Sequence, residues 1–171
     1  MPHTADQVTE QNEADSLGRV LLVDDQPELR RLFRRSLSRV GYTVVEASSG
    51  RVAVQLLRER EFDVVISDVH MPDMSGIELL EALHDHDPDL PVVLTSGSPS
   101  QVTPLETNEL GAFAYLVKPV SFETMHDTAS RAVDMRRARA AAKALFEPLT
   151  SMKRLRVPRP DDDDDDDDDD D

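Results

Sequence analysis

Five short apolar runs recur between residues 20 and 117 and constrain the fold more than any other feature of the sequence. The runs are rich in β-branched residues, and stretches with helical spacing of apolar residues separate them. Continuous runs of this kind suit strands buried on both faces, as parallel strands are. They span residues 20–23, 43–45, 64–66, 92–94 and 113–117. Five strand–helix units predict an α/β fold, a doubly wound sandwich with helices on both faces of the sheet.

The first stretch between the runs is predicted to be an amphipathic helix. Pro27 suits the first helical position, and Gly41 can end the helix in a left-handed conformation. Apolar residues at helical spacing predict one buried stripe, made of Leu29, Leu32, Phe33, Leu37 and Val40. The basic residues fall largely off that stripe and are expected to face water; they are Arg30, Arg31, Arg34, Arg35 and Arg39.

Two further helices are expected to begin with capping boxes, at Ser75 and at Thr103, each followed by a glutamate three residues later. The helix from Thr103 is short and ends near Gly111. The last helix is expected to begin around Ser121 and to run to Phe146, before a proline.

Acidic charge is concentrated at the end of the chain. Residues 161–171 are eleven consecutive aspartates, which contribute most of the net charge of −16. Without them, 24 acidic residues stand against 19 basic ones, an ordinary balance for a soluble domain. Such a tail cannot pack, because its carboxylates repel one another and it has no apolar surface to bury. We expect residues 161–171 to be a disordered tail or an artefact, and the polar residues 1–17 to be a disordered arm.

Several classes of protein are excluded by composition. The chain has no cysteine, so it cannot form a disulfide framework, a zinc–thiolate site or a thiol nucleophile. No apolar run approaches the length of a membrane span, and the N-terminus lacks the pattern of a signal peptide. We therefore expect a cytoplasmic protein with no membrane partner.

Polar residues follow four of the apolar runs, where the carboxyl ends of parallel strands would meet and ligands bind. These residues are Asp24-Asp25, Ser67-Asp68, Thr95-Ser96 and Lys118-Pro119. Three carboxylates at one edge repel one another unless a cation lies among them. Oxygen ligands without cysteine or paired histidine favour a hard ion such as Mg²⁺. Lys118 and Thr95 suit the oxygens of a phosphate, and one carboxylate could become an acyl phosphate.

Simpler interpretations exist for each residue alone. Asp24 and Asp25 could cap the following helix, Asp68 could belong to a turn, and Tyr115 could be a core aromatic residue. If the acidic and basic groups had unrelated roles, a separate explanation would be needed at all four strand ends at once. We therefore favour a common site.

The ordered set of motifs resembles the receiver domains of bacterial two-component response regulators. The resemblance rests on residues 20–25, 68–76 and 95–97 and on Lys118-Pro119, and it covers residues 18–137. It implies a flavodoxin-like sheet of five parallel strands in the order 2-1-3-4-5. It also implies a cis peptide bond before Pro119.

The resemblance assigns a role to each site residue. Asp68 would accept the phosphoryl group, and Thr95 and Lys118 would contact its oxygens. Mg²⁺ would be held by Asp24, Asp25, Asp68 and the backbone carbonyl of His70. Tyr115 would move inward when the phosphate draws Thr95 toward it.

The implied function is a switch in a phosphorelay, not an enzyme that turns over a substrate. A sensor histidine kinase or a phosphotransfer protein would supply the phosphoryl group. Phosphorylation would change the surface formed by the helix expected at residues 103–111, the strand at 113–117 and the last helix. Residues 138–160 would form a helical extension or linker, leading to a second protomer or a downstream output domain.

Alternatives to this function remain at the level of sequence. The arginines of the first helix could suggest nucleic acid, but a solvated face that helps to dock the kinase is the preferred interpretation. A phosphohydrolase with an aspartyl nucleophile would want a carboxylate two residues after Asp68, where His70 stands. A pseudo-receiver that is never phosphorylated would not need the full set of site residues. The histidines lack metal-ligand spacing and are expected to be exposed.

Overall fold

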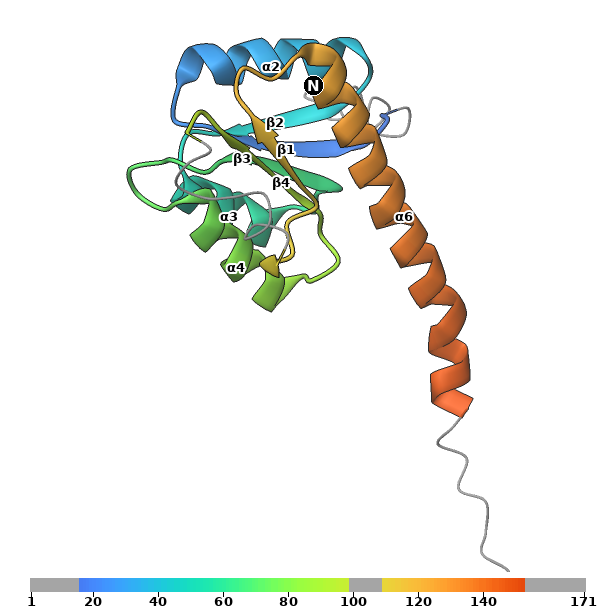
Figure 1. Ribbon diagram of the computed structural model, residues 1–171. Coiled ribbons are helices and arrows are strands. Elements are labelled where there is room, and N and C mark those ends of the chain that lie inside the picture. Colours follow the sequence, from blue (N-terminus) through green and yellow to red (C-terminus); the bar gives the residue numbers. More distant parts are fainter. Residues whose placement is uncertain (1–15, 99–108, 153–171) are drawn as a thin grey trace, which may run out of the picture. The chain divides into compact units, whose positions relative to one another are not determined.

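A single sheet of five parallel strands, in the order β2-β1-β3-β4-β5, forms the centre of the fold (Figure 1). This computed structural model describes residues 16–98 and 109–152, with side chains described up to residue 146. The strands are β1 (Arg19–Val23), β2 (Thr43–Ala47), β3 (Val64–Asp68), β4 (Val92–Ser96) and β5 (Ala114–Val117). Every pairing is parallel, so the predicted fold class and strand order are confirmed.

The burial of the strands follows their place in the sheet. The central strands β3 and β4 are buried along their whole length, and β1 along all but its first residue. The edge strands β2 and β5 are mostly half-buried, because each has a neighbouring strand on one side only. The continuous apolar runs of the sequence thus mark the strands that are covered on both faces.

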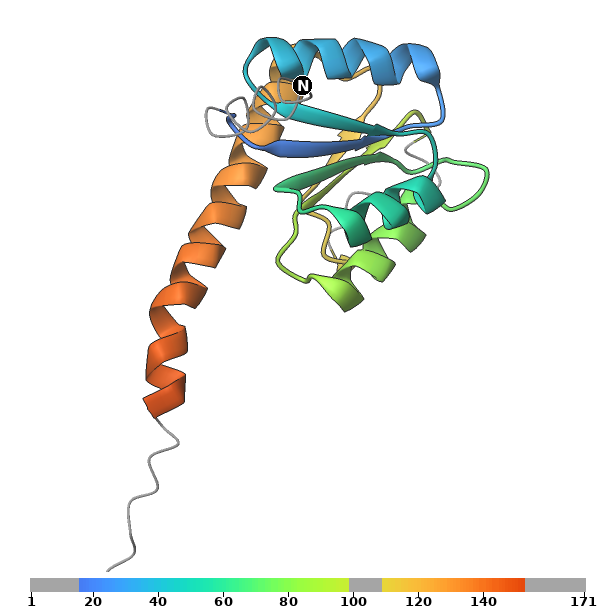
Figure 2. The same cartoon turned by 180° about the vertical axis from the view of Figure 1, so that it is seen from behind.

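Helices cover both faces of the sheet (Figures 1 and 2). The helices are α2 (Pro27–Arg39), α3 (Gly50–Glu59), α4 (Gly76–His86) and α6 (Phe122–Met152). On one face, α2 and the first turns of α6 bury a cluster that includes Phe33, Leu37, Met125, Ala129 and Val133. On the other face, α3 and α4 bury Ala53, Leu79, Leu80 and Leu83. The chain divides into two compact units, Met1–Arg139 and Ala140–Asp171, and the sheet lies in the first.

Most of the predicted helix signals are confirmed. Pro27 is the first residue of α2, and Gly41 follows the helix with a left-handed φ of 109°. The capping box of α4 is complete: the Ser75 hydroxyl accepts from the Glu78 N–H at 3.1 Å, and the Glu78 carboxylate accepts from the Ser75 N–H at 2.8 Å. The capping box predicted at Thr103 lies outside the described residues.

The buried stripe predicted for α2 is narrower than expected. Phe33 and Leu37 are buried, but Leu32 is 47% exposed and Val40 is 42% exposed. Leu32 lies about 100° around the helix from Phe33, because an α-helix has 3.6 residues per turn. Val40 is the C-cap residue, beyond the last turn that packs on the sheet. The prediction was therefore wrong for these two residues.

Two further expectations about the helices are corrected. Helix α6 continues past Phe146 to Met152, so Pro148 lies within the helix and does not mark its end. His84 and His126 are half-buried, not exposed as predicted. The ring of His84 lies against Gly111, and His126 Nε2 is 2.9 Å from the Ser36 hydroxyl.

A bidentate ion pair links the end of α4 to α6. Arg136 donates to both oxygens of Asp87, with nitrogen–oxygen distances of 2.9 and 2.6 Å. The hydrogen bonds and charge of Arg136 lower the pKa of Asp87, although partial burial opposes the shift. The same contacts raise the pKa of Arg136. Paired hydrogen bonds between charged groups are among the stronger polar contacts in proteins.

We expect Asp87→Asn to reduce the free energy of unfolding by about 1 kcal/mol at neutral pH, because the variant loses the charge of this pair. The folded-state pKa of Asp87 is depressed, so the stabilisation is present above the unfolded-state pKa of about 3.9 and is lost as pH falls through the folded-state pKa. Urea titrations of wild type and variant should therefore converge in acid.

The exposed pair of Asp127 and Arg131, 3.6 Å apart on α6, provides the control. Asp127→Asn should change the free energy of unfolding by less than about 0.5 kcal/mol at any pH. Equal effects of the two substitutions would contradict a special role for the Asp87 pair.

Candidate functional site

The carboxyl ends of β1, β3, β4 and β5 meet at one edge of the sheet, and each brings a polar residue there. Asp24 and Asp25 directly follow β1, and Asp68 is the last residue of β3. Thr95 in β4 pairs with Asp68 in the strand register. Lys118 directly follows β5. In a parallel sheet, this edge is where ligands bind.

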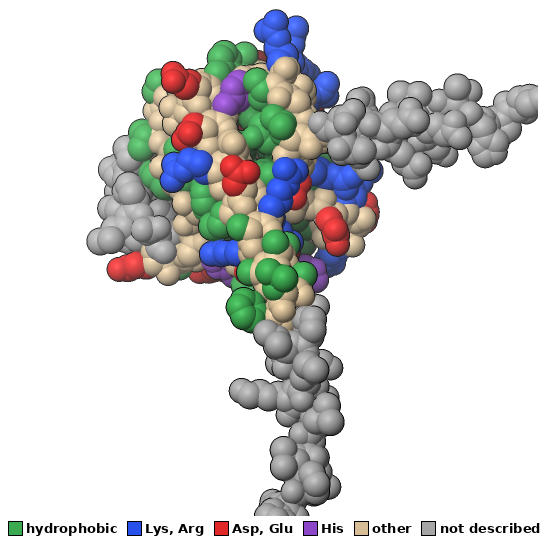
Figure 3. All heavy atoms as spheres, turned by 90° about the vertical axis from the view of Figure 1, so that its right-hand side faces the viewer, with side chains coloured by type: hydrophobic (Ala, Val, Ile, Leu, Met, Phe, Trp, Pro, Cys, Tyr) green, Lys and Arg blue, Asp and Glu red, His purple; other side chains and the backbone are tan. Residues whose placement is uncertain are grey.

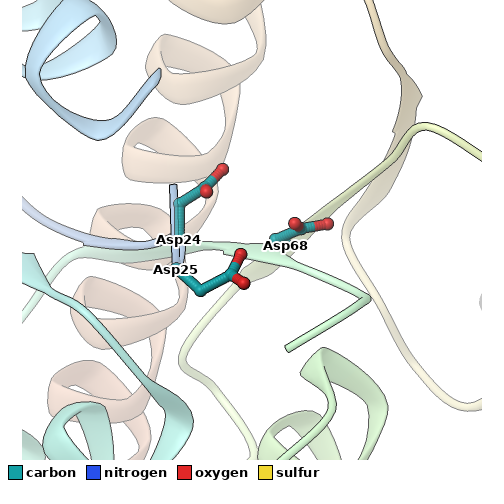
Figure 4. A group of neighbouring side chains, drawn as sticks. All are labelled: Asp24, Asp25 and Asp68. Atoms are coloured by element: carbon teal, nitrogen blue, oxygen red, sulfur yellow. The ribbon is translucent and has the colours of Figure 1, made fainter. Parts of the chain in front are cut away.

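Three carboxylates converge at this edge (Figure 4). One oxygen from each of Asp24, Asp25 and Asp68 lies within 4.8 Å of the others. Asp24 and Asp68 are buried and Asp25 is exposed, so the cluster is open to solvent on one side. Like charges this close destabilise one another unless a cation is bound. An all-oxygen donor set fits a hard cation such as Mg²⁺.

Lys118 supplies part of the compensating charge. Its Nζ lies 3.2 Å from Asp24 Oδ2 and 3.2 Å from Asp68 Oδ2. The lysine side chain is only 16% exposed, so water screens these contacts weakly. One ammonium group against three carboxylates leaves a net negative site. The charge balance of these residues therefore fits an additional divalent cation.

Backbone hydrogen bonds hold the two buried carboxylates. Asp24 Oδ1 accepts from the N–H of Gln26 at 2.8 Å. Asp68 Oδ1 accepts from the N–H of His70 at 3.3 Å, which keeps residue 70 beside the acidic cluster while its ring stays exposed. These contacts fix the side chains before any ligand binds.

Thr95 and Tyr115 lie on the neighbouring strands β4 and β5, and Thr95 pairs with Asp68 in the strand register. The buried Thr95 hydroxyl donates to the carbonyl of Ser67 at 3.4 Å, a long bond that a better acceptor could replace. The hydroxyl of Tyr115 is buried, and among the described residues it has no hydrogen-bond partner. The peptide bond before Pro119 is cis, as the resemblance implied.

The loop that follows Asp68 is held from two sides. The N–H of Gly76 donates to the carbonyl of Val69, and a Cβ at Gly76 would collide with the carbonyl oxygen of Asp68. The Asp73 carboxylate accepts from the N–H groups of Gly50 and Arg51 at the start of α3, at 3.4 and 3.1 Å. Slight burial would raise the pKa of Asp73, but these hydrogen bonds and one from Ser49 outweigh it and lower the pKa.

Sequence reasoning missed one residue beside the site. Arg30 was expected to face water, but its side chain is only 16% exposed and donates to the carbonyl of Asp24. The other arginines of α2 are exposed. Helical spacing alone could not distinguish Arg30, because its position in the first turn of α2, six residues after Asp24, places it near the site only once the helix is oriented.

Residues 20–130 match the response regulator receiver domain. The chain belongs to the receiver domain family of response regulators. It is 29% identical over 136 residues to the regulatory protein AtoC of Escherichia coli (strain K12), a match covering 80% of this chain and 30% of AtoC. It is 42% identical over 109 residues to the two-component response regulator ARR2 of Arabidopsis thaliana, covering 63% of this chain and 16% of ARR2. The match thus spans less than a third of the length of either relative.

Solved receiver structures have the same fold. The receiver domain protein of Methanospirillum hungatei JF-1 aligns with a TM-score of 0.68 and 27% identity, over 72% of this chain and 99% of that one. The chemotaxis protein CheY4 of Vibrio cholerae aligns with a TM-score of 0.63 and 34% identity, over 67% and 97% of the two chains. In the part of the receiver chain that the structure describes, no helix is long and apolar enough to cross a membrane.

The close approach at Gly76 can be tested by comparison with Gly97, which follows β4. We expect Gly76→Ala to lower the free energy of unfolding by about 2 kcal/mol or more, because the added methyl must displace the main chain of Asp68. In Gly97→Ala the new methyl meets no atom of the described residues within 4 Å, so stability should change little. Urea unfolding of both variants measures the difference, and equal stability would contradict the proposed collision.

Proposed function

We propose that this receiver domain accepts a phosphoryl group on Asp68 from a sensor histidine kinase or a phosphotransfer protein. Mg²⁺ would be bound by Asp24, Asp25, Asp68 and the backbone carbonyl of His70. One observation carries the proposal: three carboxylates and the Lys118 ammonium converge at the carboxyl edge of the sheet. Membership of the receiver family supports it further.

The transfer step follows from the chemistry of these side chains. A carboxylate oxygen of Asp68 attacks phosphorus, and the bond from phosphorus to the histidine nitrogen of the donor breaks. Lys118 neutralises charge on the phosphoryl oxygens, and the Thr95 hydroxyl donates to one of them. Bound Mg²⁺ supplies further neutralisation of that charge. Water then hydrolyses the acyl phosphate and returns Asp68 to its carboxylate form.

The phosphorylated state would differ at the neighbouring strands. A phosphoryl dianion on Asp68 is a stronger acceptor than the Ser67 carbonyl, so it would draw the Thr95 hydroxyl away from that carbonyl. Tyr115 could then move inward, and the surface of β5, α6 and the helix expected at residues 103–111 would change. Such a switch shifts a pre-existing equilibrium between two states. Residues 103–108 of that surface lie outside the described part of the chain.

The remaining assignments belong to the same proposal. Residues 18–137 would act as the receiver, and residues 138–160 as a helical extension to a second protomer or an output domain. We expect the receiver to act in the cytoplasm without direct contact to nucleic acid. On the face in Figure 3, Lys and Arg side chains are interspersed with Asp and Glu side chains, unlike the basic surface that nucleic acid favours.

Labelling of Asp68 tests the proposal directly. With phosphoramidate and Mg²⁺, the wild-type chain should gain one phosphoryl group by intact-mass measurement, and borohydride trapping should locate it at residue 68. Asp68→Asn should gain none, because an amide cannot form the acyl phosphate. Equal labelling of Asp68→Asn would disprove the assignment, and absence of labelling in wild type would favour a pseudo-receiver.

The metal requirement gives a second test. Asp25→Asn should raise the Mg²⁺ concentration for half-maximal phosphorylation by about tenfold or more, because hard-ion binding depends on ligand charge. Phosphorylation reads out the site alone, so weak binding of Mg²⁺ elsewhere on the chain does not interfere. Asp127→Asn, an exposed carboxylate on α6, is the matched control and should leave that concentration unchanged.

A further inference from the structure

We propose that Arg30 is a positioning residue for the acidic site. Its guanidinium joins the main chain of the turn that carries Asp24 and Asp25 to Glu46 on β2. The inference rests on the metal site proposed above. It assigns to Arg30 the task of holding the turn in place while the site contains no metal.

The geometry of Arg30 is that of a bridge. Its Nη1 donates to the carbonyl oxygen of Asp24 at 2.6 Å, and its Nε lies 3.4 Å from Glu46 Oε1. The arginine and glutamate side chains are 16% and 25% exposed, so both groups are largely withdrawn from water. A guanidinium has several donors in a fixed plane and can serve both partners at once, whereas a lysine ammonium is a single point on a flexible chain.

The peptide groups on both sides of Asp24 are thereby attached to the same strand, β2. The N–H of Asp24 donates to the carbonyl of Ala47 at 3.2 Å, so it is attached to β2 directly. The carbonyl of Asp24 is attached to the preceding residue of β2, Glu46, through Arg30. Loss of the guanidinium would release one of these two attachments.

The repulsion within the acidic cluster explains why the turn after β1 is attached to β2. Three carboxylates lie within 4.8 Å of one another, and their repulsion favours movement of the turn away from Asp68 when no cation is bound. Glu46 neutralises much of the Arg30 charge. Arg30 therefore acts mainly by fixing the main chain and less by attracting the carboxylates.

Arg34 provides a matched control on the same helix. It lies one turn after Arg30, and its Nη1 is 3.2 Å from the other oxygen of Glu46. Its side chain is 53% exposed, and among the described contacts it has no hydrogen bond to the turn. Removal of Arg34 thus deletes an ion pair to the same glutamate but leaves the contact with Asp24 intact.

The experiment compares Arg30→Ala, Arg30→Lys and Arg34→Ala in the full chain by amide-resolved NMR. In a Mg²⁺ titration followed at the amides of Asp25 and Gln26, Arg30→Ala should weaken binding by about tenfold, as is typical for loss of a group that orients metal ligands. Arg30→Lys should weaken it by a smaller factor, and Arg34→Ala should stay within about twofold of wild type. Reading individual amides separates this site from the aspartate tail.

A measurement without metal completes the test. Hydrogen exchange at the amides of Asp24 and Gln26 should be faster in Arg30→Ala than in Arg34→Ala, while the amides of β4 exchange at the wild-type rate. If Arg30→Ala does not fold, Arg30→Lys provides the same comparison. Equal Mg²⁺ affinity and equal exchange in the Arg30 and Arg34 variants would overturn the inference. A wild-type chain whose Asp25 and Gln26 amides do not respond to Mg²⁺ would instead refute the metal site, and the exchange comparison would still decide the role of Arg30.

Discussion

The mutual repulsion of three carboxylates at one edge of the sheet is the constraint on which the site depends. Asp24, Asp25 and Asp68 come from the ends of two adjacent strands, so the parallel pairing of β1 with β3 forces them together. Backbone hydrogen bonds, the Lys118 ammonium and the contacts of the flanking loops all act against that repulsion. A cluster of like charges lowers the stability of the folded chain, and such a cost is typical of a functional site.

The sequence predicted the sheet and the acidic edge because both depend on local patterns. Runs such as residues 64–66 are apolar throughout, which is the pattern expected of a strand covered on both faces. The site could be inferred because polar residues follow several runs at equivalent positions. Topology then places those positions at a common edge without knowledge of any side-chain contact.

The errors share a different origin. The exposed Leu32 and the half-buried Arg30 both belong to α2, and their burial depends on how that helix is rotated against the sheet. The same holds for His84, which packs against the main chain of a residue distant in sequence. Long-range contacts of this kind leave no periodic signal in the sequence. The sequence also gives no sign that Asp73, which lies shortly before α4, accepts hydrogen bonds from the start of α3.

Because every residue of the proposed site lies at one edge of the sheet, the two edges differ in how well they tolerate changes to the sequence. The connections at the opposite edge, such as the exposed residues 60–61 between α3 and the buried Phe62, carry no residue of the proposed site. Peptide insertions or fluorescent reporters placed there would leave the chemical edge untouched. A deletion of a single residue between β1 and α2, by contrast, would turn α2 about its axis and detach Arg30 from the turn. Insertions at the edge opposite the site thus spare the site residues, whereas deletions at the edge of the site displace them.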